Sequence, residues 1–231
     1  MPRLRREFHS SISKAKTPAE HQKILATIYQ RHGLLLETAM QFREVKLACA
    51  AGCSYCCHLK VDVKAHEVIF LSSYLKRVLQ DDEIRSLVKR CDEHRQRYML
   101  QTLKEQMVAN NACPLLVNGR CSAYLARPFS CRNHHAQAVN PCREAFEKPE
   151  MYLTTPGTED KVVKGIGGIV WMICGEIYSE LGFDSRVYDL GCALYEALTN
   201  PKCEKRWRDK STAFSKIAVV KDTIENWKSV P

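Results

Sequence analysis

Seven of the chain's twelve cysteines form two groups whose spacing could hold a metal ion or a metal cluster. The first group lies in the stretch CAAGCSYCC, and the second is spread over a longer, loop-like stretch. Neighbouring thiolates repel one another and oxidise unless a cation holds them, and thiolate donors select zinc, copper(I) or iron-sulfur clusters over harder ions. The candidate metal ligands are Cys49, Cys53, Cys56, Cys57, Cys113, Cys121 and Cys131.

Disulfides and core packing are the two other uses of cysteine to be weighed. The first sixteen residues begin with basic side chains but lack the apolar stretch of roughly 7 to 15 residues that an export signal needs. We therefore expect a cytoplasmic protein, in whose reducing surroundings structural disulfides are rare. Core packing is the better interpretation for Cys91, Cys174 and Cys192, which lie in apolar helical patterns, while Cys142 and Cys203 stay undecided.

The first group offers more sulfurs than one regular turn can direct to a single point. Cys53 with Cys56, or Cys53 with Cys57, would present two sulfurs to the same side of a helical turn. Adjacent Cys56 and Cys57 would point about 100° apart on a helix, so either the turn is irregular or they face different centres. Four sulfurs complete one tetrahedral zinc site or one four-iron cluster, which leaves a surplus for a second site or a redox role.

The second group, Cys113, Cys121 and Cys131, is too widely spaced to chelate a metal alone, so we expect it to fold back on the first. A mixed site with histidine would favour zinc, although such histidines are also found as outer hydrogen-bond donors or at the surface. The neighbouring histidines are His58, His134 and His135. Arg127 and Arg132 bracket Cys131, where a guanidinium could donate hydrogen bonds to sulfur or simply lie at the surface.

The rest of the chain carries the pattern of amphipathic helices. Thr17-Pro18-Ala19-Glu20 is a capping box with proline at the first helical position, and it predicts a long helix that runs into the first cysteines. Further helices are predicted within 68–91, over 159–182 and over 185–198, with proline-rich loops from 110 to 158 between them. The predicted fold class is mostly α, a helical domain with an irregular, metal-stapled cysteine-rich loop region.

We divide the chain into three parts. Residues 1–16 form a basic N-terminal segment, and 17–158 form the cysteine-cluster metal-binding domain with its leading helix. Residues 159–231 form a helical extension packed on that domain. The longest apolar run, 166–174, is too short to cross a bilayer, so we expect no membrane insertion.

The formal charge of +9 raises the question of a nucleic-acid partner. Bound thiolates would offset part of this charge. The basic clusters RLRR and KCEKRWRDK lack the interleaved aromatic residues of single-strand binders and lie on no recognisable reading helix. We therefore expect no nucleic-acid binding, and the partner or substrate, expected to be a protein, is not identified.

Two blocks of the sequence resemble the YkgJ-type cysteine-cluster family, also described as a zinc- or iron-chelating CxxCxxCC domain. The blocks are CAAGCSYCC with the following HLKVDVKAHEVIFLSSYL, and CPLLVNGRCSAYLARPFSCR. The resemblance covers roughly residues 49–142. Three residues separate Cys49 from Cys53, where the family name has two, so Cys49 is the least secure ligand. The resemblance implies a bound zinc or iron, with an iron-sulfur cluster as the leading expectation.

The expected function is that of a metal-binding protein with an iron-sulfur cluster of the 4Fe-4S type, in a redox, electron-transfer or modification-assisting role. One alternative is a zinc-stapled protein-interaction module. The other is a cluster-containing modifying enzyme, because a related branch of the family is similar to flagellin lysine N-methylase. The chain shows no glycine-rich loop for S-adenosylmethionine and no clear catalytic constellation, so no catalytic residue is assigned.

Overall fold

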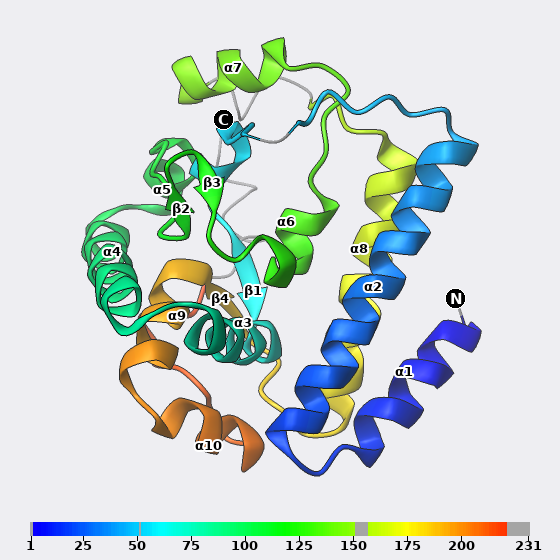
Figure 1. The fold of residues 1–231 in the computed structure, drawn as a ribbon, viewed down its shortest axis with the longest axis vertical. Coiled ribbons are helices and arrows are strands. Elements are labelled where there is room, and N and C mark those ends of the chain that lie inside the picture. Colours follow the sequence, from blue (N-terminus) through cyan, green and yellow to red (C-terminus); the bar gives the residue numbers. More distant parts are fainter. Residues whose placement is uncertain (1, 51, 151–156, 221–231) are drawn as a thin grey trace.

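The computed structural model describes residues 2–50, 52–150 and 157–220 (Figure 1). Within these ranges it is built mainly of helices, with two small antiparallel sheets, so the prediction of a mostly α fold with an irregular cysteine-rich region is confirmed. The α-helices are α1 (Pro2–Lys14), α2 (Pro18–Phe42), α3 (Ala65–Val78), α4 (Asp81–Leu100), α5 (Leu103–Val108), α6 (Phe129–Asn133), α7 (Asn140–Glu147), α8 (Lys161–Glu180), α9 (Leu190–Thr199) and α10 (Lys202–Arg208). The 3₁₀ helices and strands are η1 (Tyr55–His58), η2 (Tyr124–Ala126), β1 (Asp62–Lys64), β2 (Leu116–Val117), β3 (Arg120–Cys121) and β4 (Val187–Asp189).

Helix α2 begins as the sequence predicts and ends earlier. Thr17 Oγ1 accepts from the Glu20 backbone N–H at 3.2 Å, and Glu20 accepts from the Thr17 N–H at 2.9 Å. The expectation that this helix runs into the first cysteines is wrong, because it stops at Phe42. Glu44 then takes a φ of 51°, a left-handed conformation that cannot continue a right-handed helix.

The helices form one large hydrophobic core that joins distant parts of the chain, with a small second cluster around Leu36, Ala39 and Val163. Helices α2 and α8 run side by side with α1 beside α8, and α4, α9 and α3 pack on the opposite side (Figure 1). Strands β1 and β4 pair antiparallel, with Val63 opposite Tyr188. The helix predicted over 185–198 therefore begins only at Leu190, since the preceding residues are used in β4. The division into three parts stays a prediction.

Helix α8 is longer than the apolar run in the sequence suggested. By length and composition it could cross a membrane, with a mean hydropathy of 1.3. In this fold it packs against α1, α2 and α6, as the core helix of a folded domain does. A Cβ at Gly167 would lie 1.8 Å from Asn133 Oδ1, so this glycine allows α6 to approach α8 closely.

A buried carboxylate fixes the position of α6, which carries Cys131. Glu67, in the first turn of α3, accepts hydrogen bonds from the Phe129 N–H at 2.8 Å, Trp171 Nε1 at 3.2 Å and the Tyr29 hydroxyl at 3.4 Å. It thereby joins α3 to α6, α8 and α2. Since the side chain is fully buried, these donors have no access to water as a substitute partner.

We expect Glu67→Ala to lower the free energy of unfolding by about 3 kcal/mol, because it leaves several buried donors without an acceptor. Urea unfolding followed by circular dichroism measures the change. The matched control is Glu93→Ala, which removes an exposed carboxylate from α4 and should change stability by less than about 0.5 kcal/mol. Equal effects of the two substitutions would contradict the role given to Glu67.

Candidate metal centre

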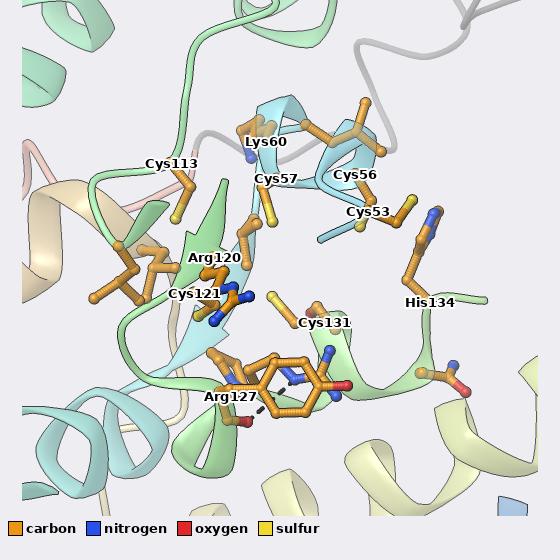
Figure 2. A pocket seen from close by; sticks show the side chains of 18 of the residues that line it. Cys53, Cys56, Cys57, Lys60, Cys113, Arg120, Cys121, Arg127, Cys131 and His134 are labelled. Atoms are coloured by element: carbon orange, nitrogen blue, oxygen red, sulfur yellow. Dashed lines mark hydrogen bonds between the residues drawn. The ribbon is translucent and has the colours of Figure 1, made fainter. Parts of the chain in front are cut away.

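A cavity of about 790 Å³ collects most of the predicted ligands at the meeting point of η1, the β2–β3 hairpin and α6 (Figure 2). The cysteines that line it are Cys53, Cys56, Cys57, Cys113, Cys121 and Cys131. The Cys113 N–H donates to the Cys57 carbonyl oxygen at 2.8 Å, so the backbone itself ties the two groups together. Cys49 is not among the lining residues and lies exposed on the preceding loop.

The hairpin β2–β3 places Cys121 at the cavity. Asn118 and Gly119 have φ values of 50° and 72°, the left-handed pair that a tight two-residue hairpin turn requires. Cys121 pairs with Leu116 across the hairpin. An Asn-Gly pair is the strongest short-range signal for a hairpin, so the sequence contains a signal for this element that the prediction of loops over 110–158 overlooks.

The two arginines around Cys131 have different surroundings. Arg127 lines the cavity, with its Nε donating to the Tyr124 carbonyl oxygen at 3.2 Å and its guanidinium 3.7 Å from the centre of the Tyr124 ring. Arg132 instead donates to the Arg127 carbonyl oxygen at 2.6 Å and lies over the Tyr29 ring. Of these two arginines, Arg127 is therefore the one whose positive charge lies at the cavity that holds the sulfurs.

The cavity thiols are hard to ionise without a cation. Burial raises the pKa of Cys131 to about 12, and the neighbouring sulfurs of Cys121 and Cys56 contribute to the rise. Burial likewise raises the pKa of Cys113 and of Cys121. The positive charge of Arg127 opposes this shift at Cys131 and Cys121 without reversing it. A bound metal cation would supply the missing positive charge and hold the thiolate form.

The adjacent Cys56 and Cys57 lie in a 3₁₀ turn, so the turn is irregular compared with an α-helix. A hydrogen bond with the Cys57 side chain is the largest cause of the raised pKa of Cys56, followed by burial. The two sulfurs are therefore near neighbours. Cys56 also lines a second cavity of about 270 Å³, whose lining does not include Cys57.

The three histidines are engaged to different degrees. His135 uses both ring nitrogens, with Nδ1 at 3.2 Å from the Asn133 carbonyl oxygen and Nε2 accepting from the Asp160 N–H at 2.9 Å. His58 Nδ1 lies 3.1 Å from the Ser54 carbonyl oxygen. His134 lines the main cavity, and its Nδ1 lies 3.1 Å from Glu159 Oε1. Burial lowers the pKa of His134, but its hydrogen bond to Glu159 and the Cys56 sulfur raise it above the usual value.

The cavity sulfurs are spread more widely than the ligands of one zinc ion. Within the described ranges, only His94, Asp189 and Cys192 bring three possible ligand atoms within 4.8 Å of one another. No three cavity sulfurs are therefore that close together. Zinc–sulfur bonds of about 2.3 Å in a tetrahedron would place the sulfurs about 3.8 Å apart. The arrangement leaves room for a larger group between them.

Apart from the exposed Cys49, the cysteines outside the cavity fall into two kinds. Cys91, Cys174 and Cys192 are buried in the core, which confirms their interpretation as packing residues. Cys203 is also buried, with its Sγ 3.5 Å from the Glu196 carbonyl oxygen. Cys142, the other undecided residue, lies on α7 beside the second cavity, close to the first cysteine group.

Residues 48–155 match the model of the CxxCxxCC family, described as "Putative zinc- or iron-chelating domain". This stretch, a little under half of the chain, is similar to that family, and the match supports metal binding by the cysteine region. The match does not extend to the YkgJ subfamily, which stays a prediction. No curated protein and no solved structure matches the chain.

We expect Cys131→Ala to reduce the metal bound per chain to less than about half of the wild-type amount, because the site loses a ligand that the rest of α6 cannot replace. Elemental analysis of the purified protein measures the change. Cys203→Ala is the matched control, as it removes a buried thiol far along the chain from the cavity and should leave the metal content unchanged. Full metal content in Cys131→Ala would remove this residue from the site.

Proposed function

We propose that the main cavity binds an iron-sulfur cluster of the 4Fe-4S type and that the protein uses it in a redox or electron-transfer role, or in support of an enzymatic modification. The proposed ligands are Cys57, Cys113, Cys121 and Cys131. Figure 2 shows these four sulfurs around the middle of the cavity, while Cys53 and Cys56 lie to one side near His134. Four cysteine ligands are the usual number for such a cluster.

The observation that carries the proposal is the wide spacing of the sulfurs around the cavity. A cluster places several atoms between its cysteine ligands, whereas a single zinc ion draws four sulfurs together. The cavity of about 790 Å³ is large enough for such a group. A cytoplasmic, reducing setting is part of the proposal, because the thiolates must stay unpaired until the cluster is bound.

When bound, the cluster would supply one-electron chemistry. The chain's own contribution is electrostatic, since Arg127 presents positive charge to a site that gains negative charge on reduction. Its contacts with Tyr124 hold the guanidinium in one orientation. The apolar side chains Leu59, Val61, Leu115 and Leu190 line the same cavity and keep water from the inner sulfurs.

A zinc-stapled protein-interaction module is the second candidate. It is favoured by two large side chains beside the cavity, Tyr124 and Leu125, which are 60% and 74% exposed. Together with Arg120 and Arg127 they would form a surface for an acidic protein partner. A modifying enzyme related to protein-lysine methylases is the third candidate, and no described constellation of catalytic side chains favours it.

Iron, zinc and labile sulfide per chain test the proposal when they are measured on protein purified anaerobically without a metal-binding tag. We expect about four iron and four sulfide, with broad visible absorption that bleaches in air. Colourless protein with zinc as its only metal would contradict the cluster and support the interaction module.

Arg127→Gln should lower the reduction potential of the cluster, because the reduced state loses a stabilising positive charge. The expected shift is about 60 mV, a tenfold change in the one-electron equilibrium. A spectroscopic redox titration measures it. Arg127→Lys retains the charge and should shift the potential less, and Arg31→Gln, on the surface of α2, should leave it unchanged. A potential that is the same in all four proteins would show that Arg127 does not act on the cluster.

A further inference from the structure

Three possible metal ligands meet outside the main cavity, where α4 packs on the start of α9. They are His94 on α4, Asp189 at the N-cap of α9 and Cys192 in its first turn. One ligand atom from each lies within 4.8 Å of the other two, and in the part of the chain that the structure describes no other such group occurs. These three residues therefore meet the distance test that the cavity sulfurs do not meet.

The start of α9 places two of the ligands and makes room for the third. Two residues separate Asp189 from Cys192, a spacing that zinc-binding segments also use between neighbouring ligands. The Cys192 N–H donates to Asp189 Oδ1 at 2.9 Å, which fixes the carboxylate at the helix end. Gly191 lies between them, and a Cβ there would be only 2.3 Å from His94 Cδ2. The glycine therefore leaves the space that the imidazole occupies.

The imidazole of His94 is held with one nitrogen toward the carboxylate. Its Nε2 lies 2.9 Å from Asp189 Oδ1. Its Nδ1 is buried and has no hydrogen-bond partner among the described residues. Tyr98, one turn further along α4, stacks on the ring with 6.2 Å between ring centres. The polar contact that the described structure gives this ring is thus the one with Asp189.

The buried charge of Asp189 lacks a permanent cation. Burial raises the pKa of Asp189, but hydrogen bonds from His94 and Cys192 outweigh burial and lower it below the usual value, so the group is a carboxylate. Its ion-pair partner is His94, which is charged only when it is protonated. No lysine or arginine among the described residues pairs with it. A carboxylate that is 1% exposed is strongly destabilising unless a cation compensates for it.

Cys192 has the same need for positive charge. Burial raises the pKa of its thiol, and the charge of Asp189 raises it further. A divalent ion would balance one carboxylate and one thiolate, with a neutral imidazole as the third ligand, and such a site has no net charge to bury. Cys192 is a core residue like Cys91 and Cys174, but of these three only Cys192 has both an imidazole and a carboxylate within 4.8 Å.

We infer that His94, Asp189 and Cys192 form a second metal centre, which binds zinc and joins α4 to the start of α9. The thiolate disfavours calcium and magnesium, and the nitrogen, oxygen and sulfur donors are the three types that zinc accepts. On binding, the thiol proton of Cys192 passes to water. The ion also takes the place of the proton between His94 and Asp189, and their separation widens by about half an ångström. The centre uses no cavity cysteine, so it does not rest on the proposed function.

Three protein ligands leave a fourth position on the ion for a water molecule. His94 is the ligand that reaches solvent, with 16% of its side chain exposed, whereas the side chain of Asp189 is 1% exposed. The ion and its water would therefore enter from the α4 side.

Zinc per chain in the wild type, Asp189→Asn and Cys192→Ala tests this inference, when each protein is incubated with excess zinc and then freed of unbound ion. We expect each variant to hold about one zinc less than the wild type. Asp189→Asn is the sharper variant, because asparagine also caps a helix and keeps the shape of the side chain while the ligand charge is lost. Cys203→Ala removes a buried thiol elsewhere and should keep all the zinc. Equal zinc in the wild type and both variants would overturn the second centre.

Thermal unfolding gives a second readout. Zinc that binds the folded chain raises Tm. We expect the rise to be smaller in Asp189→Asn than in the wild type and unchanged in Cys203→Ala. The same rise in Asp189→Asn as in the wild type would contradict the inference.

Iron and labile sulfide, measured on the same samples, report on the main cavity and keep the two proposals separate. About four iron, with no difference in zinc between the wild type and the variants, would support the cluster and overturn the second centre. No iron, with about one zinc lost in both variants, would do the reverse.

Discussion

The arrangement of this protein depends on keeping several cysteine thiolates together in a partly buried place. Burial and mutual repulsion raise the pKa of these thiols, and Arg127 alone does not compensate for it. The sulfurs come from η1, the β2–β3 hairpin and α6, and a long stretch of chain separates η1 from the other two. A bound metal is therefore the interaction that makes it favourable for these thiolates to lie close together. The surrounding helices have to hold the three cysteine-bearing segments in position before the metal binds.

The helical part of the fold holds these segments in position. Glu67 fixes the start of α6 against α3, α8 and α2, and Gly167 lets α6 come close to α8. The pairing of β1 with β4 joins the chain after η1 to the segment that precedes α9. A core of this size does not need a metal to fold, so the metal organises the cysteine region and leaves the helices to stabilise the rest.

The features that could be predicted from the sequence are those that depend on residues close together in the chain. The capping box of α2, the amphipathic helices and the clustered cysteines are short patterns, and each predicts a feature without knowledge of the rest of the chain. The early end of α2 was missed because a non-glycine residue, Glu44, takes the left-handed conformation that ends the helix, and the sequence carries no glycine stop signal there. The late start of α9 was missed because strand β4 forms through a tertiary contact, its pairing with β1. The position of Cys142 was missed for the same reason, since only the packing of Phe146 on η1 brings α7 to the first cysteine group.

X-ray absorption at the iron edge of the anaerobically purified protein tests the central claim most directly, because it reports the atoms around the iron. The account predicts an iron edge with sulfur neighbours and a further shell of iron at short distance, as in a cluster held by cysteines. Iron surrounded by oxygen and nitrogen, with no iron neighbours, would contradict the view that the cavity cysteines hold an iron-sulfur cluster.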